Sequence, residues 1–135
     1  LTGLPNRHAL QKAIDHAMAM ARRKGRALAV LFVDLDGFKN VNDDCGHEAG
    51  DRVLQEIARR FAVRTRDMDT VARIGGDEFV VVMEDLDDGR YAATLAAKLL
   101  GAAAEPMVVH GRTLELTASV GISVFPGDGR ELERA

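Results

Sequence analysis

Apolar residues recur along the chain with two periods, one typical of helices and one typical of strands. Helical spacing of three and four residues marks three segments, at about residues 6–24, 53–61 and 88–105. The continuous apolar run Leu28–Val33 is typical of a strand buried on both faces. Apolar residues alternate with other residues over 116–124, which predicts a half-buried strand late in the chain.

Two further pairs of short β-forming runs predict β-hairpins. The first pair, residues 70–74 and 79–83, is joined by a tip that contains two adjacent glycines. The second pair, residues 107–109 and 113–116, flanks His-Gly-Arg. Because hairpins force antiparallel neighbours, the pattern predicts an α+β fold with a mostly antiparallel central sheet flanked by helices.

Composition narrows the class of protein without identifying it. A chain of 135 residues with 47% hydrophobic residues predicts one globular domain, and the net charge of -3 argues against a nucleic-acid surface. Cys45 is the only cysteine, so neither an intrachain disulfide nor a cysteine zinc cluster is expected. No apolar run approaches the roughly 18 residues of a membrane span, so no membrane contact is expected from this segment.

The chain starts and stops abruptly, so we expect it to be a piece of a longer protein. The domain itself is expected in the reducing environment of the cytoplasm. Other segments of the full-length protein could still anchor it to a membrane.

The tip of the first hairpin carries the clearest chemistry. Gly75 and Gly76 permit positive φ and lack β-carbons, so a ligand could approach the backbone closely. Asp77 and Glu78 follow at once, and carboxylates hold the hard divalent cations that bridge to phosphates. The tip therefore predicts a site for a metal-bound phosphate, although a solvated acidic turn is the alternative.

A second acidic position follows the buried strand. Asp34 and Asp36 come directly after its apolar run, and the period of two places both side chains on one side of the strand. A carboxylate at the end of a central strand is costly unless a partner such as a metal compensates it. The alternative interpretation is that Asp34 only caps the next turn.

Asn42 and Asp51 are polar residues placed where a pair of helices opens. Each could cap a helix. A guanine ring, with donors on N1 and N2, would equally need such an acceptor-rich pair. These residues alone leave both interpretations open.

Taken together, four motifs resemble the GGDEF domain, the diguanylate cyclase family. The motifs are Leu1–Arg7, Asp34–Lys39, Asn42–Asp51 and Arg73–Phe79, and they follow in the family's order. Ser119–Ile122 fits as well, and the likeness covers residues 1–135 as a single domain. The resemblance implies a ferredoxin-like palm related to nucleotide-cyclase and polymerase palms. It also implies the condensation of two GTP molecules into cyclic di-GMP with release of two pyrophosphates.

The resemblance also assigns roles to individual positions. Asp34, the Leu35 carbonyl and Asp77 would bind Mg²⁺ or Mn²⁺, and Glu78 would join Asp77 in catalysis by helping to activate the ribose 3′-hydroxyl. Phe38 and Lys39 would bind the β- and γ-phosphates of GTP, largely through their backbone amides. Asn42 and Asp51 would bind guanine. Gly75 and Gly76 would leave room for the sugar and phosphates. Since one domain holds one GTP, the active species would be a symmetric homodimer.

Three further expectations follow from the family pattern. Arg66 and Asp69 fit the RxxD site at which the product cyclic di-GMP inhibits. The family's C-terminal helix, which carries a Lys and an Arg toward the triphosphate, is missing from the sequence. Residues 104–126 resemble GGDEF domains fused to EAL phosphodiesterase domains, so flanking sensory or EAL domains are expected. The alternative function is a regulatory module that binds GTP or cyclic di-GMP without turnover.

Overall fold

The computed structural model of the chain describes residues 3–126. Ten elements follow in the order α1 (Arg7–Lys24), β1 (Ala27–Asp36), α2 (Phe38–Cys45), α3 (His47–Ala62), β2 (Thr70–Gly75), β3 (Glu78–Leu86), α4 (Arg90–Ala104), β4 (Met107–Val109), β5 (Arg112–Leu114) and β6 (Thr117–Phe125).

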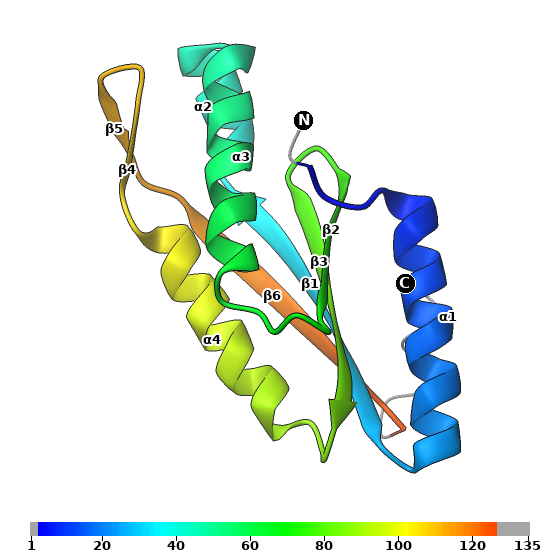
Figure 1. The fold of residues 1–135 in the computed structure, drawn as a ribbon. Helices are drawn as coiled ribbons and strands as arrows, with labels where there is room; N and C mark the ends of the chain where they lie inside the picture. Colours follow the sequence, from blue (N-terminus) through cyan, green and yellow to red (C-terminus); the bar gives the residue numbers. More distant parts are fainter. Residues whose placement is uncertain (1–2, 127–135) are drawn as a thin grey trace.

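Four of the strands form one antiparallel sheet in the order β2-β3-β1-β6, while β4 and β5 form a separate hairpin (Figure 1). β1 lies between β3 and β6, which explains why its sequence is an uninterrupted apolar run. Both predicted hairpins are present, and the predicted α+β class with an antiparallel sheet is confirmed.

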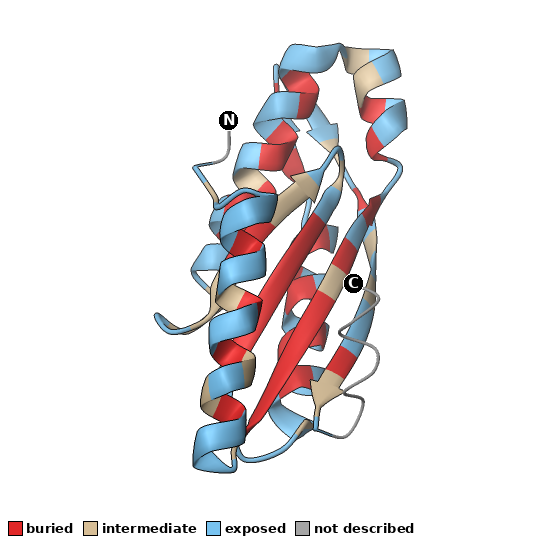
Figure 2. Ribbon diagram, turned by 90° about the vertical axis from the view of Figure 1, so that its right-hand side faces the viewer, coloured by how far each residue is buried: buried red, intermediate tan, exposed pale blue. Residues whose placement is uncertain are grey.

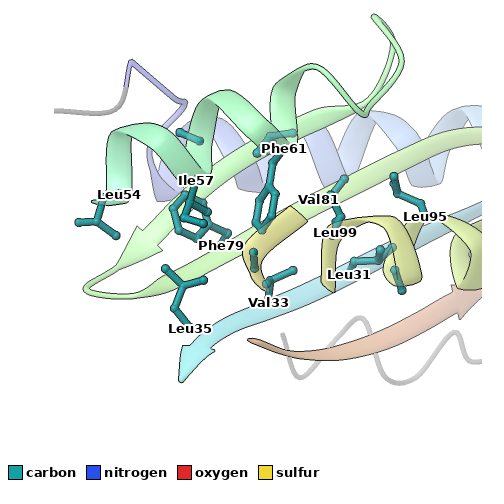
Figure 3. Packing of buried hydrophobic residues seen from close by; sticks show 14 of the residues in the cluster. Leu31, Val33, Leu35, Leu54, Ile57, Phe61, Phe79, Val81, Leu95 and Leu99 are labelled. Atoms are coloured by element: carbon teal, nitrogen blue, oxygen red, sulfur yellow. The ribbon is translucent and has the colours of Figure 1, made fainter. Parts of the chain in front are cut away.

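Helices cover both faces of this sheet. α1 packs on one face against β2, β3 and β1, whereas α3 and α4 pack on the other (Figure 1). The central strands β1 and β3 are the most buried strands of the sheet (Figure 2). In the α3–α4 layer, Phe61 meets Phe79 edge to face with ring centroids 5.5 Å apart, and Leu31, Leu95 and Leu99 continue the core (Figure 3).

α1 is capped at both ends, whereas the start of α4 has no side-chain cap. The Asn6 side chain accepts a hydrogen bond from the Ala9 backbone N–H, and Gly25 ends α1 in the left-handed conformation. The N-cap of α4 is Gly89, which offers no side-chain bond, and the Asp88 carboxylate one residue earlier accepts from the backbone N–H of Arg90, the first residue of α4.

The segment between β1 and β2 is more helical than the pattern indicates. Residues 38–45 form the helix α2, where the sequence pattern leaves a loop and a short helical turn as alternatives. α3 begins at His47, so Asp51 lies inside this helix. Because Asn42 and Asp51 both lie within helices, neither is an N-cap, and the capping interpretation of this pair is wrong.

Arg60 ties α3 to the end of α4. Its side chain is 7% exposed, and its guanidinium donates to the Glu56 carboxylate and to the carbonyls of Ala102, Glu105 and Pro106. These carbonyls lie at and just beyond the C-terminus of α4, which has no basic residue in its own last turn. Arg60 therefore supplies from another helix the donors that this helix end needs.

Across residues 3–126, no helix combines the length and apolar character needed to cross a bilayer.

Candidate functional site

The β2–β3 hairpin ends in a two-residue turn, Gly76-Asp77, between the paired residues Gly75 and Glu78. The Arg73 side chain donates from Nε to the Gly76 carbonyl at 3.0 Å and so fixes one side of the turn. A register shift between Arg73 and Gly75 marks a bulge just before the tip. Bulges re-aim side chains, and here the bulge directly precedes the acidic pair.

The two glycines of the tip are not required by its backbone conformation. Neither Gly75 nor Gly76 has a positive φ, although the sequence suggested that they could use one. A β-carbon added to either would meet no protein atom within 4 Å. Because both residues lack side chains and no other protein atom fills that space, the tip leaves room for a bulky ligand.

β1 brings a third carboxylate to this tip. Asp34 lies directly opposite Glu78 in the β1–β3 ladder, and the next residue, Leu35, donates its backbone N–H to the Asp77 carbonyl at 3.1 Å. Partial burial raises the pKa of Asp34, and the neighbouring charges of Asp77, Glu78 and Asp36 raise it further. Asp34 and Asp36 are both exposed while Leu35 between them is buried, which agrees with the prediction that the two acids lie on one side of the strand.

This donor set fits a hard divalent cation. Carboxylate oxygens and a backbone carbonyl are ligands that Mg²⁺ and Mn²⁺ accept, and a cation would relieve the repulsion that raises the pKa of Asp34. Within residues 3–126, no three His, Cys, Asp or Glu side chains stand ready as a complete metal-ligand group. A cation at this tip would therefore need oxygens from a bound ligand or water, as is usual for Mg²⁺.

The N-terminus of α2 lies just after β1 and offers unbonded backbone donors. Its cap residue is Gly37, in the left-handed conformation with φ 82°, and no side chain caps the helix. The first amides after Gly37, those of Phe38 and Lys39, point away from the helix without intrahelical acceptors. Phe38 is itself buried and belongs to the core cluster on the α3–α4 side of the sheet.

α2 and α3 pack closely enough to bring Asn42 toward Asp51. A β-carbon on Gly50 would lie 1.8 Å from Asn42 Oδ1 and 3.3 Å from Phe38 Cζ, so the Asn42 amide rests directly on the backbone of Gly50. Asp51 is the next residue and is exposed. Gly50 thus lets Asn42 lie against α3 one residue before Asp51, and the sequence pattern does not reveal this role because it depends on how the two helices approach.

Arg66 and Asp69 lie at the other end of β2 from the acidic tip. They bind each other: Arg66 Nη2 is 2.7 Å from Asp69 Oδ1, and the Arg66 backbone N–H donates to the same carboxylate at 2.9 Å. Arg66 also donates to the Glu84 carbonyl and lies over the Tyr91 ring, 5.7 Å from its centroid. The Asp69 side chain is 0% exposed, so only the guanidinium of this pair presents a surface to a ligand.

Comparison with known proteins identifies the family of the chain. The family model described as "Diguanylate cyclase, GGDEF domain" matches residues 1–135. The chain belongs to the GGDEF diguanylate cyclase family, as its motifs indicated. It is 46% identical over 130 residues to the bifunctional diguanylate cyclase/cyclic di-GMP phosphodiesterase MucR of Pseudomonas aeruginosa, covering 96% of this chain and 19% of MucR. It is also 44% identical over 133 residues to the cyclic di-GMP phosphodiesterase NbdA of the same species, covering 98% of this chain and 17% of NbdA.

Solved structures of the same family share the fold. The GGDEF domain of TpbB (YfiN) from Pseudomonas aeruginosa superposes with a TM-score of 0.91 at 39% identity, covering 94% of this chain and 80% of that one. The GGDEF domain of DgcB from Caulobacter crescentus, in complex with cyclic di-GMP, gives a TM-score of 0.88 at 28% identity, covering 99% and 82%. The chain spans about a fifth of the length of the two curated relatives.

Proposed function

We infer that this domain is catalytic and joins two GTP molecules into cyclic di-GMP. The observation that carries this is the convergence of Asp34, Asp77 and Glu78 at a hairpin tip kept open by two glycines. Three carboxylates that repel one another at a hairpin tip are costly unless a bound cation compensates them, and such a cation is what the reaction needs. In each half-reaction, a ribose 3′-oxygen attacks the α-phosphorus of the other GTP, and the bond from that phosphorus to pyrophosphate breaks.

The residues around the tip have three roles in this reaction: cation binding, proton acceptance and phosphate binding. Asp34, Asp77 and the Leu35 carbonyl would hold Mg²⁺ or Mn²⁺, which when bound lowers the pKa of the hydroxyl and neutralises phosphate charge. Glu78 stands beside the attacking hydroxyl and accepts its proton. The amides of Phe38 and Lys39 at the start of α2 receive the β- and γ-phosphates.

Guanine is held between α2 and α3. The Asp51 carboxylate accepts from N1–H and from one N2–H of the base, and the Asn42 side-chain oxygen accepts from the other N2–H. The open side of Gly75 and Gly76 receives the sugar. Each domain binds a single GTP, so the 3′-oxygen on one domain reaches the α-phosphorus on another, and the working species is a homodimer with two-fold symmetry.

The test is product formation by the full-length protein. Glu78→Gln keeps the size of an exposed side chain but removes its proton acceptor, so it should abolish cyclic di-GMP synthesis from GTP and Mg²⁺ while the melting temperature stays unchanged. Glu115→Gln, the same change at an exposed position between β5 and β6, is the matched control. Turnover by Glu78→Gln within a few-fold of wild type would refute the role of this residue.

A regulatory module without turnover is the second candidate function. NbdA, 44% identical to this chain, is named only as a phosphodiesterase. In such a protein the domain would bind GTP or cyclic di-GMP and control an attached EAL phosphodiesterase domain. Full-length protein that binds GTP but forms no cyclic di-GMP, and whose phosphodiesterase rate changes with GTP, would favour this function over the first.

Arg66 is the residue we assign to product feedback. Its guanidinium can donate to a phosphate or to the acceptor edge of guanine. In the RxxD pair, the Asp69 carboxylate is already bound to Arg66 and so orients the guanidinium. A direct bond from Asp69 to the product would require the Arg66–Asp69 ion pair to open. Binding cyclic di-GMP here would hold two domains in an orientation that keeps their tips apart.

A further inference from the structure

The last two residues of β1 are held mainly from one side. β1 pairs with β3 only as far as Asp34, opposite Glu78. Its pairing with β6 continues to Leu35 opposite Ala118 and to Asp36 opposite Thr117. Beyond Asp34, the hairpin contributes the bond from the Leu35 N–H to the Asp77 carbonyl. The position of this strand end therefore depends on β6.

The Asp36 side chain makes the connection to β6 tighter. Its carboxylate accepts a hydrogen bond from Thr117 Oγ1 at 3.1 Å and from Ser119 Oγ at 3.3 Å. Thr117 and Ser119 are two residues apart on one strand, so both hydroxyls stand on the same face of the sheet as the acid. Hydrogen bonds to an ionised group are the stronger kind, so this exposed carboxylate is fixed at two points.

The chain turns sharply immediately after this anchor. Gly37 is in the left-handed conformation and starts α2 without a side-chain cap. In the described part of the chain, Asp36 is the only member of residues 35–38 whose side chain hydrogen-bonds to another element. The backbone on either side of it consists of the Leu35 carbonyl and the amides of Phe38 and Lys39.

We propose that Asp36 is a positioning residue for the turn between β1 and α2. Through Thr117 and Ser119 it ties the turn to β6 and so orients the Leu35 carbonyl and the first amides of α2 toward the metal-bound triphosphate. This inference rests on the proposed function, since it supposes that GTP binds at the turn. It assigns Asp36 a role through hydrogen bonds to β6, distinct from a role as a further negative charge at the cation.

Three variants of the full-length protein separate these two roles. Asp36→Ala removes the acceptor. Asp36→Asn keeps an oxygen acceptor for the hydroxyls but removes the charge. Thr117→Val combined with Ser119→Ala removes both donors and leaves the acid untouched. Ser123→Ala, on the same strand and the same face but opposite Val30, is the matched control.

The main readout is calorimetric binding of guanosine 5′-(α,β-methylene)triphosphate with Mn²⁺, a nucleotide that cannot release pyrophosphate. We expect Asp36→Ala and the hydroxyl-deficient variant each to weaken binding by about tenfold, whereas Asp36→Asn should stay within about threefold of wild type. The triple variant Asp36→Ala, Thr117→Val, Ser119→Ala should bind no more weakly than Asp36→Ala alone. Initial rates with GTP should fall in the same order, and Ser123→Ala should match wild type.

The proposal is overturned if the hydroxyl-deficient variant binds like wild type while both Asp36 variants are equally impaired, because the charge would then be what matters. Unchanged binding by every variant overturns it as well. If Asp36→Ala lowers the melting temperature, the hydroxyl-deficient variant, which keeps the acid, decides the question. A wild-type protein that does not bind the nucleotide contradicts the proposed function itself and is recognised before any variant is compared.

Discussion

Replacing Gly50 by alanine tests whether the approach of α2 to α3 builds the guanine site. The new β-carbon would lie 1.8 Å from Asn42 Oδ1 and 3.0 Å from Asn42 Cγ, far inside van der Waals contact. The Asn42 amide must therefore rotate away. The Phe38 ring, 3.3 Å distant and buried, must also give by a few tenths of an ångström. The substitution thus moves a base-contacting side chain without deleting it.

Two opposing terms set the change in stability. Alanine in place of glycine inside a helix favours folding by about 1 kcal/mol. Overpacking against Asn42 and Phe38 costs about 1–3 kcal/mol, so the free energy of unfolding should fall by about 0–2 kcal/mol. Loss of the Asn42 contact to guanine should cost about 1.5 kcal/mol of binding, or roughly tenfold in GTP affinity.

The assay compares GTP with ITP, which lacks the exocyclic amine of guanine. Calorimetry in the presence of Mg²⁺ should show that Gly50→Ala binds GTP about tenfold more weakly and discriminates less against ITP than wild type does. Gly101→Ala is the control, because a β-carbon there meets no atom within 4 Å. That change should stabilise α4 by up to about 1 kcal/mol and leave both affinities unchanged.

A double-mutant cycle checks the physical cause. If the clash with Asn42 is what Gly50→Ala introduces, the same substitution should cost less stability in an Asn42→Ala background. The reasoning would be refuted if Gly50→Ala kept both the wild-type affinity for GTP and the wild-type preference for GTP over ITP. The position of Asn42 would then contribute nothing to guanine binding.

Three further predictions concern the metal, the feedback site and pH. GTP should bind at least about tenfold more weakly after chelation of divalent cations, because Asp34 and Asp77 would otherwise repel the triphosphate; equal affinity in calorimetry would contradict this. Arg66→Ala should raise the cyclic di-GMP concentration needed for half-inhibition about tenfold in initial-rate titrations, whereas Arg52→Ala should not, and superimposable curves would remove the feedback role. The Arg59 and Arg60 guanidiniums lower the pKa of Glu56 to about 2, below its unfolded value, so this group stabilises the fold above about pH 4.5. That contribution, about 1–3 kcal/mol, should be lost as the pH falls toward 2, and chemical denaturation of Glu56→Gln should show a flatter pH dependence over this range.

Much of the architecture could be predicted because its signals are local. The continuous apolar run of β1 and the Gly-Gly hairpin tip each depend on neighbouring residues alone. The spacing of two also placed Asp34 and Asp36 on one side of their strand correctly. In each case a short stretch of sequence contains the whole physical cause.

The parts that escaped prediction depend on contacts between elements. The short α2 was ambiguous because eight residues carry too little periodicity to separate a helix from a turn. Gly50 had the sequence of an ordinary helix entry, and its role appears only once Asn42 lies across it. The pairing of Arg66 with a fully buried Asp69, and the anchoring of Asp36 by β6, likewise involve geometry that spacing alone does not contain.

The buried guanidinium of Arg60 has a consequence for how the domain adapts to a nucleotide. It hydrogen-bonds the C-terminal end of α3 to the carbonyls of Ala102 and Glu105 at the end of α4. Asp51 lies about 14 Å away, near the other end of α3. Sliding α3 would break all of these Arg60 hydrogen bonds at once, so this helix should behave as a rigid element with slowly exchanging amide protons. Within residues 3–126, no buried charged side chain ties α2 to another element, so its amides should exchange quickly in the free protein and slow down when GTP binds. Conformational change on GTP binding would then be confined to α2, while α3 keeps Asp51 in a fixed position against the base.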